Sequence, residues 1–108
     1  MSLLEDPSRV FLTSPFVRLE VEPKAIYYKK HLERSFYEKF FKTAVWYREL
    51  DKIEEGAQTE ASRSGLAAID ALHLAAAHLS LADEFITTGK PNKPIHRSSL
   101  VKVIYLFS

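Results

Sequence analysis

The stretch that most constrains the fold runs from residue 66 to residue 88 and reads LAAIDALHLAAAHLSLADEFITT. Its larger apolar residues recur at steps of three or four, which is the spacing of one face of an α-helix. These residues are Leu66, Ile69, Leu72, Ala76 and Leu79. Most of the residues between them are alanines, which favour a helix and keep it slim enough to approach a sheet closely. The stretch therefore predicts a helix, a tight turn and a short buried strand.

Polar residues interrupt this apolar stretch at a few places. Asp70 puts a carboxylate on the apolar helix, where it is costly unless it is paired, hydrogen-bonded or bound to a metal ion. His73 and His78 follow at helical spacing, and packing or pairing with a carboxylate is more usual for such histidines than metal ligation. Residues 85–88, FITT, form a β-prone run with hydroxyls at its end.

A strand and a helix are also predicted near the start of the chain. Arg9–Thr13 contains three adjacent apolar residues, which suits a short buried strand. Ser14 is a good N-cap, and a proline follows it, so a helix should span about Pro15–Val21. Pro23 should kink, stop or restart that helix. Glu20 lies on it, where an exposed glutamate is the ordinary interpretation and a metal ligand is the rarer one.

Aromatic residues crowd Ala25–Val45, which is predicted to be a second helical region. One stripe holds Tyr28, Leu32, Phe36, Phe40 and Val45, with Tyr37, Phe41 and Trp46 beside it. A core or a subunit interface is the more usual explanation for such a stripe. Because basic residues alternate with the aromatic ones, a base-stacking surface stays open as the alternative.

The remaining segments complete an alternation of helices and strands. Val45–Tyr47 is β-prone, and Asp51 can cap a helix that runs to about Ser64 and stops at Gly65. Leu100–Phe107 is almost wholly apolar and predicts a strand buried on both faces.

This order of elements predicts an α/β fold in which helices flank a mainly parallel sheet. The sheet should include Arg9–Thr13, Phe85–Thr88 and Leu100–Phe107, and residues 15–81 should be mostly helical. Sites in such sheets gather beyond the carboxyl ends of the strands. Ser14 and Thr88 follow strands, so we expect helix residues Glu20 and Asp70 to converge there.

Composition limits the functions that the chain can have. Its 108 residues predict a single domain over residues 1–108. Without cysteine it has no disulfide, zinc thiolate site or thiol nucleophile, and we expect a cytoplasmic location. No apolar run is long enough for a membrane span. The net charge is only +1, yet basic residues crowd the first half, where a solvated helix surface is the usual explanation and a phosphate-contacting patch the alternative.

Two segments together resemble a known family. DALHLAAAHLSLADEFITT and, more loosely, Arg9–Lys24 (RVFLTSPFVRLEVEPK) resemble PIN domains, the metal-dependent ribonuclease fold that includes VapC-like bacterial toxins. The resemblance covers roughly residues 9–89 and implies a three-layer sandwich with a mainly parallel sheet. It implies that Glu20 and Asp70 are catalytic acids that bind Mg²⁺ or Mn²⁺. It also implies that Ser14, Thr88 and the neighbouring Lys90 contact substrate.

The sequence departs from the family pattern at two acids. PIN domains begin with an apolar strand that carries their first catalytic Asp, and no such strand precedes Arg9; the segment MSLLEDPS is short and polar. The family also has an acid just after the second Thr, where this chain has Gly89. We therefore expect an N-terminally incomplete PIN-like domain that cleaves RNA weakly or not at all. Asp83 and Glu84 should lie at the opposite end of their strand and replace neither acid.

Three functions follow from these observations as alternatives. The first is a Mg²⁺- or Mn²⁺-dependent endoribonuclease of toxin–antitoxin type, acting on single-stranded RNA and held by an antitoxin protein. The second is a PIN-like domain that has lost catalysis and binds RNA or protein. The third is a structural interaction module that uses the aromatic helix. In each case we expect a homo-oligomer, because the absent first strand would leave backbone groups unpaired or apolar side chains bare.

Overall fold

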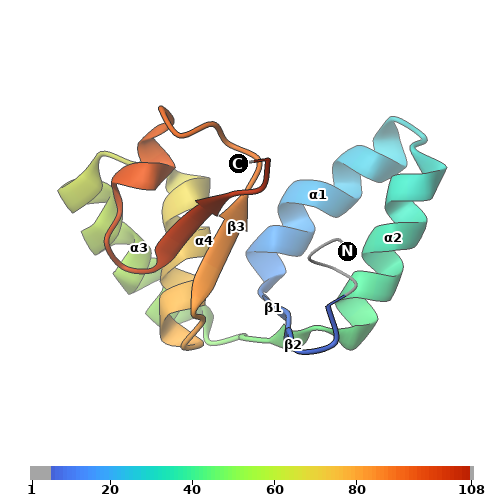
Figure 1. The fold of residues 1–108 in the computed structure, drawn as a ribbon, viewed down its shortest axis with the longest axis horizontal. Helices are drawn as coiled ribbons and strands as arrows, with labels where there is room; N and C mark the ends of the chain where they lie inside the picture. Colours follow the sequence, from blue (N-terminus) through green and yellow to red (C-terminus); the bar gives the residue numbers. More distant parts are fainter. Residues whose placement is uncertain (1–5, 108) are drawn as a thin grey trace. The chain divides into compact units, whose positions relative to one another are not determined.

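The computed structural model describes residues 6–107 and shows a mixed α/β chain of four α-helices and four short strands in that range (Figure 1). The chain divides into two compact units, Met1–Trp46 and Tyr47–Ser108, and each unit contains helices and a pair of strands. The single domain over residues 1–108 stays a prediction. The prediction that no strand precedes Arg9 falls partly on residues 1–5, which lie outside the described residues.

The first unit consists of β1 (Leu12–Thr13), α1 (Pro15–Tyr27), α2 (His31–Thr43) and β2 (Val45–Trp46). β1 and β2 pair in parallel, with Leu12 opposite Val45 and Thr13 opposite Trp46. The helices α1 and α2 form a helical hairpin that connects the two strands (Figure 1). The predicted strand Arg9–Thr13 is thus shorter than expected. An Asx turn, in which Asp6 accepts hydrogen bonds from Ser8, precedes the strand, and the N–H of Arg9 also bonds to Asp6 instead of to a neighbouring strand.

Helix α1 is longer than predicted because it continues through Pro23 to Tyr27. A proline inside a helix leaves the carbonyl four residues earlier without its hydrogen bond. That carbonyl belongs to Leu19, whose side chain is exposed, so water can reach this side of the helix and the loss is tolerated. The predicted helical region Ala25–Val45 is consequently divided, and its first residues belong to α1.

The aromatic residues of α2 divide into a packed half and an exposed half. Phe40 contacts Phe11 and Phe41 with ring centroids 5.9 Å and 5.4 Å apart, and Phe41 lies 5.4 Å from Trp46. The Trp46 indole donates a hydrogen bond of 2.9 Å to the carbonyl of Phe41. Phe40, Phe41 and Trp46 therefore pack in the core of the first unit, as the more usual explanation predicted, whereas Val45 of the stripe is 55 % exposed. The N-terminal half stays open to solvent.

The second unit consists of α3 (Leu50–Ser64), α4 (Ala68–Leu79), β3 (Glu84–Thr87), the 3₁₀-helix η2 (Pro94–Arg97) and β4 (Lys102–Tyr105). Its buried apolar side chains include Ile53, Ala57, Leu74, Ala75, Ile95 and Val101. α3 and α4 pack closely, and a Cβ added to Gly56 would lie 3.2 Å from the Cβ of Ala75. The small residues of α4 thus allow the close approach that the sequence predicts, although the partner here is a helix.

Strands β3 and β4 pair in parallel, with Glu84 opposite Lys102 and Thr87 opposite Tyr105. The parallel pairing is confirmed, but β1 and β2 form one two-stranded sheet and β3 and β4 another. The expectation that Leu100–Phe107 is a strand buried on both faces is wrong. Only four of its residues are in β4, Lys102 is exposed, and Phe107 is 70 % exposed. β4 is one of only two strands in its sheet rather than a strand in the middle of a larger covered sheet, so its side chains are at most partly buried.

For α3, the predicted end is confirmed and the predicted start is not. Gly65 adopts the left-handed conformation (φ 66°) and ends α3, as predicted. The N-cap of α3 is Glu49 rather than Asp51, which lies inside the first turn. Within residues 6–107, no helix is both long enough and apolar enough to cross a membrane.

Candidate functional site

The residues predicted to form the site are distributed over both units. Ser14 and Glu20 belong to the first unit, whereas Asp70, Thr88 and Lys90 belong to the second. The structure therefore describes the surroundings of each set separately. The convergence of Glu20 and Asp70 stays a prediction.

Ser14 is the N-cap of α1 and is fully buried. Its hydroxyl makes no capping hydrogen bond to the helix. The Oγ of Ser14 and the Oγ1 of the preceding Thr13 are both buried without a hydrogen-bond partner among the described residues. Most buried hydroxyls in proteins have a partner, so a pair of free ones calls for an explanation. The substrate-neighbour role expected for Ser14 stays a prediction.

Glu20 lines a cleft between α1 and α2. The other lining residues are Val21, Lys24, Tyr28, Lys30, Glu33 and Tyr37. Burial raises the pKa of the Tyr37 phenol, and the nearby carboxylates of Glu33 and Glu20 raise it further. Two carboxylates therefore act on one hydroxyl in this cleft. Sequence reasoning missed Glu33. It lies in the first turn of α2, and only the hairpin of α1 and α2 shows that this turn faces α1.

Asp70 lies in the first turn of α4 and is partly exposed. The partial positive charge at a helix N-terminus stabilises a carboxylate there, so Asp70 does not require a metal ion to be tolerated. Among the described residues it takes part in no hydrogen bond or ion pair. Its carboxylate is therefore open to a ligand, but its position alone does not demand one.

The histidines that follow Asp70 on α4 have structural surroundings. His73 is buried and stacks on Phe85 of β3, with ring centroids 6.3 Å apart. The Nδ1 of His78 lies 3.3 Å from the carbonyl oxygen of Leu100. The surroundings of His73 agree with packing, the more usual role for such a histidine, whereas His78 is exposed.

The loop after β3 is organised by residues other than those predicted. Thr88 and Lys90 are exposed. The hydroxyl of Thr87 accepts a hydrogen bond of 3.0 Å from the Gly89 N–H, and the Nε2 of His96 lies 2.8 Å from the Gly89 carbonyl oxygen. Thr87 and His96 thus hold the loop, and the substrate contacts expected of Thr88 and Lys90 stay predictions.

Glu60 is a buried carboxylate that sequence reasoning missed, and its side chain is only 1 % exposed. It accepts hydrogen bonds from Arg63 and Ser64 of the same helix and one of 3.0 Å from Ser98. Burial alone would raise the pKa of Glu60, but the hydrogen bonds from Ser64, Arg63 and Ser98 outweigh it and lower the pKa. Glu60 follows Ile53 and Ala57 at helical spacing, so the sequence pattern could have predicted that Glu60 lies on the buried face of α3.

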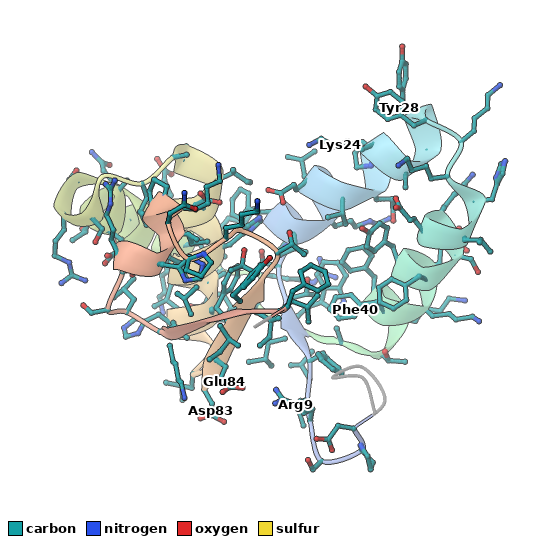
Figure 2. All side chains as sticks on the ribbon, turned by 45° about the horizontal axis from the view of Figure 1, so that its top comes forward. Arg9, Lys24, Tyr28, Phe40, Asp83 and Glu84 are labelled. Atoms are coloured by element: carbon teal, nitrogen blue, oxygen red, sulfur yellow. The ribbon has the colours of Figure 1, made fainter. Side chains whose placement is uncertain are left out.

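Within residues 6–107, no cluster of three or more histidine, aspartate or glutamate side chains is arranged to hold a metal ion. Asp83 and Glu84 lie together at the start of β3, at the end opposite Thr87, as the sequence predicts (Figure 2). The chain matches no family model, no curated protein and no solved structure.

Proposed function

We propose that the chain is a PIN-like domain of the VapC-like type that binds single-stranded RNA and cleaves it weakly or not at all. In this proposal the fold is the three-layer sandwich that the resemblance implies. Glu20 and Asp70 are the remaining acids of the family site, and Ser14, Thr88 and Lys90 contact substrate.

The observation that carries the proposal is the local structure of residues 68–87. The resemblance implies a helix of small residues with an Asp near its start, followed by a strand that ends in Thr. The observed elements have this order, with Asp70 in the first turn of α4 and β3 ending at Thr87, one residue before the Thr88 that the resemblance names. The two unpartnered hydroxyls beside the start of α1 give separate support, since Ser14 is expected to lie next to substrate.

The expectation of weak catalysis follows from the acids that remain. Magnesium sites for phosphodiester hydrolysis need several oxygen ligands, and magnesium releases its water reluctantly. Glu60 is already occupied by three hydrogen bonds, and Asp83 and Glu84 lie at the wrong end of β3. With Gly89 in place of an acid, Glu20 and Asp70 by themselves do not make a complete site for Mg²⁺ or Mn²⁺.

The test is cleavage of a fluorescent single-stranded RNA with Mg²⁺ and with Mn²⁺, alongside the Asp70→Asn variant. We expect no more than trace cleavage by the unmodified chain and no further decrease in the variant. Robust cleavage that is lost in Asp70→Asn would show that two carboxylates suffice and that the expectation of weak catalysis is wrong. Cleavage that is equal in both proteins would indicate a contaminating nuclease.

A protein-binding module, with an antitoxin-like protein or a second copy as partner, is the second candidate. It is favoured by apolar side chains exposed along α1, where Leu19 is 66 % and Ile26 is 46 % exposed. Such a row of side chains is typical of a helix that packs against a partner. Failure of the chain to bind RNA, together with self-association, would favour this function over the first.

A further inference from the structure

The segment where α1 passes into α2 exposes three large side chains. Tyr27 is 78 %, Tyr28 is 65 % and Leu32 is 89 % exposed. The Tyr27 and Tyr28 rings lie edge to face with centroids 4.9 Å apart. Figure 2 shows Tyr28 at the outer end of α1, with Lys24 one turn before it. We call residues 24–34 the α1–α2 tip.

The α1–α2 tip is also strongly basic. It holds four basic side chains and one acidic side chain, so its net charge is +3 with His31 neutral. Arg34 forms an exposed ion pair with Glu38 at 3.5 Å. Among the described residues, Lys24, Lys29 and Lys30 form no ion pair. Three lysines without a partner beside two exposed rings favour a ligand that is anionic and has flat aromatic faces.

Backbone hydrogen bonds hold the turn that carries these side chains. Lys30 donates its N–H to the carbonyl of Ala25 at 2.9 Å, and Lys29 donates to Ile26 at 3.2 Å. These two bonds form a Schellman motif, which requires the left-handed conformation seen at Lys29 (φ 54°). A ligand would therefore meet a preorganised turn, and less ordering on binding means higher affinity.

We propose that the α1–α2 tip binds single-stranded RNA, with bases stacking on Tyr27 and Tyr28 and phosphates contacting Lys24, Lys29 and Lys30. The inference rests on the proposed function for the identity of the ligand. It adds basic and aromatic contacts to that function, and three of them, Lys24, Tyr28 and Lys30, line the same cleft as Glu20. Stacking on tyrosine is tolerant of sequence, so this surface supplies affinity and orientation rather than base recognition.

The experiment is a fluorescence anisotropy titration of the full chain with labelled oligouridine, repeated at several salt concentrations. The double variant Tyr27→Ala/Tyr28→Ala should lose about tenfold or more in affinity, while Tyr27→Phe/Tyr28→Phe keeps the rings and should keep the affinity. Lys29→Ala/Lys30→Ala should reduce the slope of log affinity against log salt by about 1.4, since each phosphate contact to a single strand contributes about 0.7.

The matched control is Lys39→Ala/Lys42→Ala, which removes the same charge from the other end of α2. An equal loss of affinity in that control would overturn the inference, because it would mean that general charge explains the binding. Strong RNA binding that the tyrosine variant leaves intact would also overturn it while leaving the proposed function in place. No binding by the unmodified chain would reject both. Binding to anionic phospholipid vesicles, lost in the tyrosine variant, without RNA binding would assign the surface to a membrane instead.

Discussion

At the residue scale, the buried Glu60 shows how a charge is accommodated inside a small core. Its pKa is lowered in the folded chain, because the hydrogen bonds from Ser64, Arg63 and Ser98 outweigh the effect of burial. A carboxyl with a lowered folded pKa stabilises the fold above its unfolded pKa, and this contribution is lost as the pH falls through the folded pKa. The bonds tie α3 to the segment before β4, so the residue acts on the whole second unit.

We predict that Glu60→Gln lowers the free energy of unfolding by about 1–3 kcal/mol at pH 7, the usual effect of weakening hydrogen bonds to a buried charged group. The difference from the unmodified chain should shrink as the pH falls below about 4.5, where the native carboxyl loses its advantage. Urea titrations at pH 7, 5, 4 and 3 measure this. The control is Glu54→Gln on the exposed side of the same helix. A loss at Glu60 that does not change with pH would contradict the assigned role of its charge.

Gly89→Asp restores one family acid and tests the catalytic argument at a single position. An added Cβ would lie 3.3 Å from the Thr87 hydroxyl and 3.7 Å from the Lys93 side chain, so it fits if these neighbours shift slightly. We expect a loss of stability of at most about 1 kcal/mol and no gain in RNA cleavage, because the first-strand acid is still missing. Thermal unfolding and the cleavage assay check both results. Strong cleavage by Gly89→Asp would show that three acids are enough.

At the element scale, sequence reasoning located helices and strands well because their signals are local. The apolar spacing of α4, the proline after Ser14 and the glycine after α3 each act within one turn of chain. The prediction failed where the end of a helix depended on more than local preference. Pro23 does not end α1, because the carbonyl that loses its hydrogen bond lies on the exposed side of the helix. The break between α1 and α2 was missed for a related reason. A Schellman motif is usually marked by glycine, and here lysine occupies the left-handed position.

Lysine and leucine occupy left-handed positions after α1 and α4, and both are predicted to be strained. Lys29 has φ 54° and Leu81 has φ 62°, a conformation that costs an ordinary residue about 1–2 kcal/mol. Lys29→Gly and Leu81→Gly should each raise the free energy of unfolding by about 0.5–1 kcal/mol, after the greater freedom of glycine in the unfolded chain is subtracted. Urea denaturation measures both.

Two further variants serve as controls for this prediction. Lys30→Gly changes a neighbouring residue with a negative φ and should give no gain in stability. Gly65→Ala should lower stability, since Gly65 has φ 66° and an added Cβ would meet the Arg97 side chain at 3.1 Å. A gain in Lys30→Gly equal to that in Lys29→Gly would mean that relief of left-handed strain is not the cause.

At the scale of the whole molecule, the pairing of strands and the partners of the site residues could not be predicted from sequence. Parallel pairing follows from alternating helices and strands, and it is observed. Which strands pair depends on contacts between distant segments, and here each pair forms within its own unit. The same limit applies to the candidate site, for which the resemblance names single residues such as Ser14 and Asp70 but not their neighbours. The neighbours that decide the chemistry of a site residue, such as Glu33 near Glu20, are brought there by packing between elements.

The last prediction is that the chain self-associates at micromolar concentration. Two-stranded sheets are marginally stable alone, and within residues 6–107 each of the two sheets has only two strands. α1 adds an exposed row in which Ile26 and Tyr27 follow Leu19 by two turns. Sedimentation velocity between 5 and 200 μM, on the order of concentrations at which weak interfaces populate dimers, should show a dimer or larger species. Leu19→Glu/Ile26→Glu should shift it to monomer if α1 is the interface, whereas an unchanged oligomer in that variant would point to the strand edges. A monomer at the highest concentration would contradict association by either route, and the two short sheets would then have to be stabilised by their own helices alone.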